Sequence, residues 1–117
     1  MATSGILASA TFNALTYTSI YGPPADTFAV VTVSIVNKNT NSIFVRLAAA
    51  VDPNIPAAGN YLEYESEILP GGVLERSGIV IQNGRTLYAY STGPTGATNA
   101  TASSTDVVVY GIETPTV

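Results

Sequence analysis

The chain has 117 residues, of which 46% are hydrophobic and only 10% are charged, and its formal net charge is −4. This length suffices for one domain with its own hydrophobic core, and a charged fraction far below the ~25% of typical soluble domains predicts a largely neutral surface that tends to associate. Four basic residues are too few for nucleic-acid or membrane-surface binding, and the absence of Cys and His excludes disulfides, thiolate chemistry and Cys/His zinc sites.

Eight short runs rich in β-branched and aromatic residues, separated by Gly, Pro, Asn and Asp, predict an all-β fold. We expect strands at Ile6–Phe12, Thr16–Tyr21, Phe28–Asn37, Ser42–Val51, Leu62–Leu69, Val73–Ile81, Thr86–Ser91 and Asp106–Ile112. The expected architecture is a single antiparallel β-sandwich over residues 1–117, Ig-like or jelly-roll-like. The N-terminus lacks the basic segment of a secretory signal, and residues 1–5 should form a short arm before the first strand. No stretch approaches the ~20 apolar residues of a membrane span.

Turn-forming residues occupy several of the gaps between these runs. Residues 38–41, Lys-Asn-Thr-Asn, predict a hairpin because Asn tolerates the left-handed backbone conformation. Pro70-Gly71-Gly72 and Asn83-Gly84 predict two further tight turns, and Gly78 predicts a bend within its strand. Residues 93–105 have few apolar anchors and are expected to form a mobile loop.

The runs at 28–37 and 42–51 are apolar on both faces, although a sandwich strand normally has one polar face. Alternation places four apolar side chains on one face of the first run: Ala29, Val31, Val33 and Ile35. The opposite face, with the arginine-bearing face of the second run, supplies our candidate assembly interface: Phe28, Val30, Val36, Phe44, Arg46, Ala48 and Ala50. The sequence leaves two explanations open, because either the long loops of the chain or another subunit would cover such a surface.

Three glutamates alternate with other residues in the predicted strand at 62–69: Glu63, Glu65 and Glu67. They are expected on one face, roughly 7 Å apart, where they would suit a cation site or the paired carboxylates of a glycosidase. A glycosidase also needs a cleft and one acid in an apolar environment, and a row of like charges supplies neither. We therefore expect a solvated outer face whose carboxylates pair across strands with basic side chains, namely Arg46, Arg76 or Arg85.

The remaining residue types do not combine into a catalytic or cofactor site. Asp52-Pro53-Asn54 lacks the spaced acids of a calcium loop. Without His a Ser triad is impossible, and the single lysine, Lys38, lies in a polar turn where nothing desolvates it. Stacking on sugars would allow carbohydrate binding at five tyrosines, although Trp is absent: Tyr17, Tyr21, Tyr61, Tyr88 and Tyr90. We expect no enzyme activity, no cofactor and no metal.

Five segments over roughly the central two thirds of the chain form a further pattern. They are Ile35-Val36-Asn37, Val45-Arg46-Leu47-Ala48, Tyr61-Leu62-Glu63-Tyr64, Gly72-Val73-Leu74-Glu75-Arg76-Ser77-Gly78-Ile79 and Leu87-Tyr88-Ala89-Tyr90-Ser91. The order and sequence of these five segments resemble those of small virion structural proteins of tailed bacteriophages. Such proteins include head decoration (cement) proteins and modules of tails and fibres.

The resemblance implies a non-enzymatic virion protein, made in the host cytoplasm and carried in the phage particle. The first expectation is a capsid decoration protein that binds the assembled head and stabilises it. Its partners would be the major capsid protein or another virion protein and copies of itself, with a trimer suggested by the resemblance alone. The alternatives are a tail, fibre or baseplate module and, from a different class, a carbohydrate-binding host-attachment domain. No nucleic acid or membrane is expected as a partner.

Overall fold

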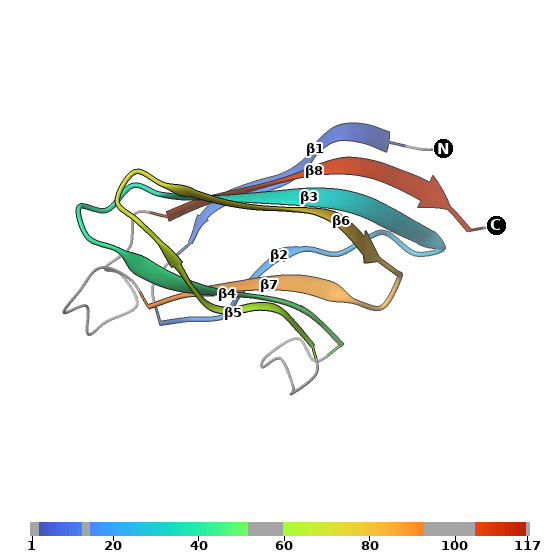
Figure 1. The fold of residues 1–117 in the computed structure, drawn as a ribbon. Helices are drawn as coiled ribbons and strands as arrows, with labels where there is room; N and C mark the ends of the chain where they lie inside the picture. Colours follow the sequence, from blue (N-terminus) through green and yellow to red (C-terminus); the bar gives the residue numbers. More distant parts are fainter. Residues whose placement is uncertain (1–2, 13–14, 52–59, 93–104, 117) are drawn as a thin grey trace.

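The computed structural model describes residues 3–12, 15–51, 60–92 and 105–116, which form two packed four-stranded sheets (Figure 1). The strands of these ranges are β1 (Thr3–Phe12), β2 (Thr18–Tyr21), β3 (Thr27–Asn37), β4 (Ile43–Ala50), β5 (Tyr61–Ile68), β6 (Val73–Ile81), β7 (Thr86–Ser91) and β8 (Thr105–Pro115). All paired neighbours are antiparallel. The fold is the antiparallel β-sandwich that the sequence predicts.

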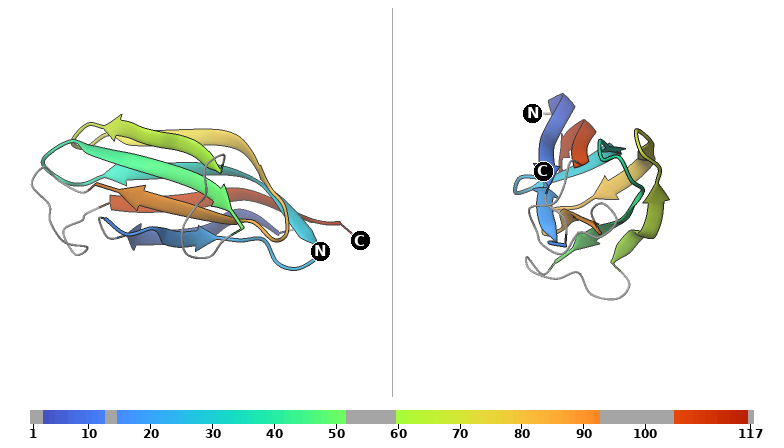
Figure 2. Two further views of the ribbon diagram at one scale, coloured as in Figure 1. Left: turned by 90° about the horizontal axis from the view of Figure 1, so that it is seen from below. Right: turned by 90° about the vertical axis from the view of Figure 1, so that its left-hand side faces the viewer.

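The first sheet has the order β1-β8-β3-β6 and the second the order β2-β7-β4-β5. Figure 2 shows the two sheets as layers facing each other. Every connection between consecutive strands crosses from one sheet to the other, except the connection from β4 to β5. The turns at 38–41, 70–72 and 83–84 are present between strands, but none of them closes a hairpin within one sheet. The hairpin prediction was wrong because turn residues mark where the chain reverses, and not which sheet the next strand joins.

All eight predicted strands are present, and the largest change in their bounds is at the paired ends of β1 and β8. β1 begins at Thr3, so residues 3–5 belong to a strand and not to a leading arm. β8 continues to Pro115, because Thr3 and Ser4 pair with Glu113 and Ile112. The ends of β1 and β8 thus form backbone hydrogen bonds with each other. The sequence did not predict these ends because they contain Gly, Glu and Pro, which have low strand propensity. Thr105 starts β8, and the rest of the predicted loop at 93–105 lies outside the described residues.

The hydrophobic core lies between the sheets. From the first sheet it receives Ala29, Val31, Val33, Ile35, Ile79, Ile81, Val107 and Val109. From the second sheet it receives Tyr21, Ile43, Val45, Leu47, Ile68, Leu87 and Ala89. The alternation in β3 is as the sequence predicts, because a strand directs every second side chain to the same side.

A buried asparagine joins two turns at one end of the sandwich. The side-chain amide of Asn37, which is fully buried, donates to the carbonyl groups of Asn41 and Ile68, each at 2.9 Å. Its side-chain oxygen accepts from the backbone N–H of Asn39 at 2.9 Å, and its backbone oxygen accepts from Gly71 at 2.9 Å. One side chain therefore ties the turn after β3 to the turn after β5.

Polar contacts also link the sheets along both open sides of the sandwich. On one side the hydroxyl of Tyr21 in β2 donates to Glu113 in β8 at 2.5 Å, and burial together with this bond raises the pKa of Tyr21. On the other side Arg76 of β6 forms an ion pair with Glu63 of β5. The first contact joins the edge strand β2 to the inner strand β8, and the second joins the edge strands β5 and β6; neither pair of strands lies in the same sheet.

Two glycines shape the first sheet. The pairing of β3 with β6 shifts between Val31 and Val33, opposite Gly78, whose φ of 72° suits glycine, so the predicted irregularity is present as a bulge. In β8, a Cβ on Gly111 would collide with the carbonyl oxygen of Val30 and lie 2.8 Å from the Cα of Val31. Glycine at this position therefore allows β8 to approach β3 closely.

Candidate functional site

An exposed apolar row crosses the outer face of the first sheet. Val80 of β6 and Ile112 of β8 both pair with Val30 of β3, so the three side chains lie side by side on neighbouring strands. Their exposed fractions are 65%, 51% and 43%. Ile6 of β1, which is 72% exposed, pairs with Tyr110 next to this row. We call Ile6, Val30, Val80 and Ile112 the apolar face.

The same sheet surface becomes polar toward its other end. The hydroxyl of Tyr110 donates to Glu75 at 2.8 Å, which raises the pKa of Tyr110. Farther along, Asp106 accepts from the hydroxyl of Thr11 at 2.5 Å and forms an ion pair with Lys38 at 3.0 Å. These two contacts hold the pKa of Asp106 below its usual value. These polar side chains have partners within the chain, and the exposed Val73, which pairs with Val36, lies at the same end of the sheet.

The predicted assembly interface is divided between opposite sides of the molecule, because β3 and β4 belong to different sheets. Its β3 members Phe28, Val30 and Val36 lie on the outer side of the first sheet; Val30 is exposed and the other two are half-buried. Its β4 members lie elsewhere: Phe44 is exposed and Arg46 half-buried on the outer side of the second sheet.

Ala48 and Ala50 were predicted to lie on an exposed surface, but both are buried within the chain. The pairing of β4 with β7 runs without a shift from Val45 to Ala50, and neither alanine belongs to the core cluster between the sheets. Ala48 also pairs with Tyr88, which is buried too. Of the two explanations for this part of the surface, coverage within the chain applies.

The outer side of the second sheet carries a cluster of tyrosines around Arg46. Its guanidinium donates to Glu65 at 2.6 Å and to the hydroxyl of Tyr17 at 2.9 Å. It also lies 4.5 Å from the ring centre of Tyr64 and 4.6 Å from that of Tyr90, distances at which a cation is attracted to an aromatic ring. Although burial opposes the charge, the bonds to Tyr17 and Glu65 raise the pKa of Arg46.

The tyrosines of this cluster also contact one another. The hydroxyl groups of Tyr17 and Tyr61 share a hydrogen bond of 2.6 Å, and the rings of Tyr17 and Tyr90 have centres 4.7 Å apart. Tyr61 meets Tyr64 edge to face at 4.9 Å. Burial and the bond to Tyr17 raise the pKa of Tyr61 to about 12. We call these residues, with Arg46 and Glu65, the tyrosine–arginine cluster.

The cluster brings together three of the five tyrosines considered for sugar binding, Tyr17, Tyr61 and Tyr90. The other two, Tyr21 and Tyr88, are buried elsewhere. Most aromatic surface in the cluster is used in internal contacts, and Tyr64 is its exposed member, at 57%. Sequence reasoning missed Tyr64 as a sugar-stacking residue because its contact with Arg46 of β4 forms only in the folded sheet.

The three glutamates of β5 do not share a face. Glu65 has a φ of 56° at a register shift, and this irregularity separates it from Glu63. Glu65 pairs with Arg46, whereas Glu63 pairs with Arg76 and accepts from Ser66 at 2.6 Å. The pairing with these two arginines is confirmed, and the common face is wrong. The bonds from Ser66 and Arg76 lower the pKa of Glu63.

The described residues include no group of three or more side chains suited to a metal ion. Asp52-Pro53-Asn54, considered for calcium, lies outside these residues.

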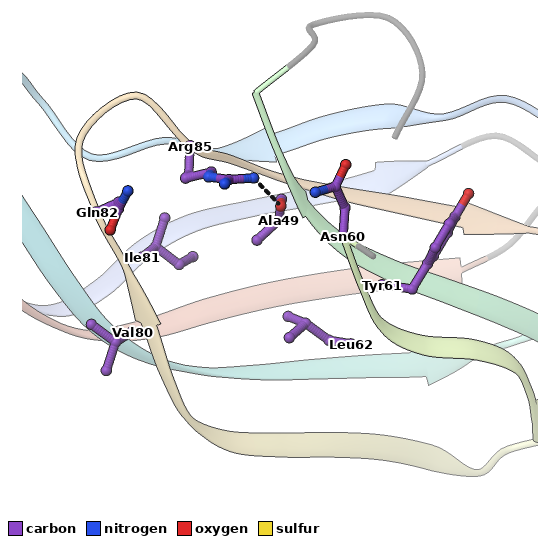
Figure 3. Close-up of a pocket in the computed structure, with 8 residues that line it drawn as sticks. All are labelled: Ala49, Asn60, Tyr61, Leu62, Val80, Ile81, Gln82 and Arg85. Atoms are coloured by element: carbon purple, nitrogen blue, oxygen red, sulfur yellow. Dashed lines mark hydrogen bonds between the residues drawn. The ribbon is translucent and has the colours of Figure 1, made fainter. Parts of the chain in front are cut away.

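A hollow of about 290 Å³ lies where β5 and β6 face each other (Figure 3). It is lined by Ala49, Asn60, Tyr61, Leu62, Val80, Ile81, Gln82 and Arg85. The guanidinium of Arg85 lies 3.4 Å from the carbonyl oxygen of Ala49. In Figure 3 the polar ends of Arg85 and Asn60 lie on one side of the hollow, with Val80 and Leu62 across from them.

No protein-family model, curated protein or solved structure matches this chain. Among the residues that the structure describes, no helix is long and apolar enough to cross a membrane. The function must therefore be inferred from the surfaces described above and from the resemblance of the central segments.

Proposed function

We propose that the chain is a non-enzymatic structural protein of a phage particle, acting as a decoration protein that binds the assembled head. Attachment takes place through the apolar face. The observation that carries this proposal is the row Val80–Val30–Ile112, in which exposed aliphatic side chains adjoin on three neighbouring strands. Contiguous exposed apolar surface commonly marks an interaction site, and the resemblance to virion proteins is our ground for proposing the class of partner.

Burial of this face would stabilise the particle by the hydrophobic effect. Each Å² of apolar surface removed from water contributes roughly 25 cal/mol, and a standard protein interface buries about 800 Å² per partner. Many copies bridging neighbouring capsid subunits would therefore add substantial stability to the shell. A site formed by two neighbouring subunits exists only after assembly, so we expect binding to heads and not to free subunits.

The electrostatics of the described carboxylates favour a structural role over hydrolysis. Glu63, Glu65 and Asp106 each form an ion pair with a basic side chain. The pKa values of Glu63 and Asp106 are lowered, whereas a general acid near neutral pH needs a raised pKa.

The test is co-sedimentation with purified assembled heads and, separately, with unassembled capsid subunits. The wild-type chain should bind heads only. Val80→Glu should abolish this binding, since a charge within an apolar contact is costly to bury. Leu69→Glu is the matched control, because Leu69 is 63% exposed and lies in the turn after β5, away from the apolar face. Equal binding to heads and subunits, or full binding by a folded Val80→Glu protein, would contradict the proposal.

A tail, fibre or baseplate module is the alternative within the same class. Such a module would be present in few copies per particle, whereas a decoration protein covers the head in many. Quantitative mass spectrometry of purified particles distinguishes the two by copy number.

A second candidate function, binding of a host-surface glycan, is favoured by one observation, the exposed ring of Tyr64 within the tyrosine–arginine cluster. Aromatic rings provide stacking surface for sugars. A glycan array probed with wild type and Tyr64→Ala tests this function, which requires a signal that the variant loses. An array without signal rejects it.

A further inference from the structure

We propose that the hollow at Arg85 is a carboxylate-binding site, occupied by an Asp or Glu side chain of the protein that covers the apolar face. This inference rests on the proposed function and adds to it the chemistry of the partner surface. It is drawn from the charges around the hollow, its lining and its position next to the apolar face.

The first argument is the pairing of charges. The chain has four basic and eight acidic residues. Lys38, Arg46 and Arg76 each form an ion pair with a carboxylate. Within the described ranges Arg85 forms none, and its contact is the carbonyl oxygen of Ala49 at 3.4 Å. Among the described residues, Arg85 is therefore the basic side chain without a carboxylate partner, and we infer that its charge can pair with a carboxylate of another protein.

The second argument is the lining of the hollow. None of the described residues that line it is Asp or Glu, and the amides of Asn60 and Gln82 lie with Arg85 around it. The planar guanidinium of arginine can donate two parallel hydrogen bonds to one carboxylate. Leu62, Val80 and Ile81 form the apolar part of the lining. Apolar surroundings strengthen an ion pair once a partner has displaced the water.

The third argument is continuity with the apolar face. Val80 belongs both to the apolar face and to the lining of the hollow. It lies on β6, the edge strand of the first sheet, which faces β5 across the hollow. A partner that covers Val30 and Val80 would therefore reach Arg85 directly. An acidic side chain at the border of an apolar contact surface matches this arrangement of apolar and positive groups.

The experiment measures the affinity for assembled heads of four folded proteins: wild type, Arg85→Gln, Arg85→Lys and Lys38→Gln. Arg85→Gln should weaken binding at least about tenfold, because it leaves the partner carboxylate covered without a cation. Arg85→Lys should recover part of the loss, since it keeps the charge but not the planar fork. Lys38→Gln makes the same change in net charge at the polar end of the first sheet and should change the affinity less than about twofold.

Several outcomes would overturn the inference. If Arg85→Gln binds heads like wild type while Val80→Glu does not bind, the carboxylate site is wrong and the proposed function stands. If neither substitution affects binding, both are wrong. Equal losses in Arg85→Gln and Lys38→Gln would indicate a general effect of charge and would reject a specific site.

A second arm separates a partner side chain from a free small carboxylate. Sodium acetate is titrated into the free protein while the side-chain Nε–H signal of Arg85 is followed by NMR. We expect only weak binding, in the range of tens of millimolar or above, because a single ion pair in open solvent contributes little. Tight acetate binding, together with unchanged head affinity in Arg85→Gln, would assign the hollow to a free carboxylate and overturn the proposal.

Discussion

The outer sides of the two sheets differ in how far their side chains satisfy one another. On the second sheet, Arg46 has a carboxylate, a hydroxyl group and two aromatic rings as partners within the chain. On the first sheet, Val30, Val80 and Ile112 contact solvent over about half of their surface or more, as exposed fractions of 43%, 65% and 51% indicate. A self-contained cluster stabilises the chain, and an exposed apolar row gains from a partner. We therefore propose that the outer side of the second sheet stabilises the chain and that the outer side of the first sheet attaches it to its partner.

The largest effect is expected from Gly111→Ala, which disrupts the first sheet beneath the apolar face. The added Cβ would collide with the carbonyl of Val30 and force β8 away from β3. The free energy of unfolding should fall by at least about 3 kcal/mol, as measured by urea denaturation. Gly22→Ala is the control, because a Cβ there meets nothing closer than 3.4 Å, and it should cost less than about 1 kcal/mol. A Gly111→Ala protein as stable as the control would contradict the close approach of β8 and β3.

Asn37→Ala should have the next largest effect, because it removes a side chain that serves both sheets. Its loss leaves the buried carbonyl group of Ile68 without this donor and removes the side-chain bonds to Asn39 and Asn41, while the backbone bonds of residue 37 to Gly71 and Gly72 remain. We expect a destabilisation of about 2–3 kcal/mol in thermal or urea unfolding. Asn41→Ala, an exposed asparagine in the same turn, should change stability by less than about 0.5 kcal/mol. Similar losses for both substitutions would mean that the Asn37 side chain has no special role.

Arg46→Gln separates the two surfaces directly. It removes the charge that pairs with Glu65 and lies between the rings of Tyr64 and Tyr90. Stability should fall by about 1–2 kcal/mol, while the affinity for assembled heads stays within about twofold of wild type. Loss of head binding by a folded Arg46→Gln protein would transfer the attachment role to the second sheet.

A smaller effect on stability is expected at acid pH from the ion pair of Glu63 with Arg76, which links the two sheets. The pKa of Glu63 is lowered in the folded chain by Ser66 and Arg76, so its contribution is complete above the pKa of the unfolded chain, about 4.3. It is lost as the pH falls through the folded-state value. Glu63→Gln should therefore reduce stability at pH 7 by no more than about 1 kcal/mol and flatten its decline below about pH 4. Glu67→Gln, an exposed change in the same strand, is the control, and an identical acid profile for wild type and Glu63→Gln would contradict this account.

The local structure was predictable from the sequence, whereas the arrangement of strands was not. β-branched and aromatic runs identified every strand, and alternation identified the core side of β3, because both depend on neighbouring residues along the chain. Sheet membership depends on pairing between distant segments. For this reason the expected hairpins are connections between sheets, and the interface drawn on β3 and β4 is split between opposite sides of the molecule.

The candidate surfaces were predictable only in part for the same reason. Val30 was identified, but Ile6, Val80 and Ile112 were not, since they adjoin it only in the folded sheet. In β6 the sequence did contain an indication of an exposed apolar residue. Val80 alternates with Ile79 and Ile81, so it points to the face opposite these two residues. The tyrosine–arginine cluster needed the irregular backbone at Glu65, and no residue pattern in the sequence indicates a positive φ there.

The most direct test of the difference between the two surfaces uses two introduced thiols. The chain has no cysteine, so Val30→Cys and Phe44→Cys each provide a single reactive group. These residues lie on opposite outer sides and are similarly exposed, at 43% and 40%. Labelling by a thiol-reactive reagent is measured by mass spectrometry for the free protein and for the protein bound to heads. The thiol at position 30 should become protected at least about tenfold on heads, and the thiol at position 44 should react as in the free protein. Protection of position 44 with continued labelling of position 30 would contradict the assignment of attachment to the first sheet.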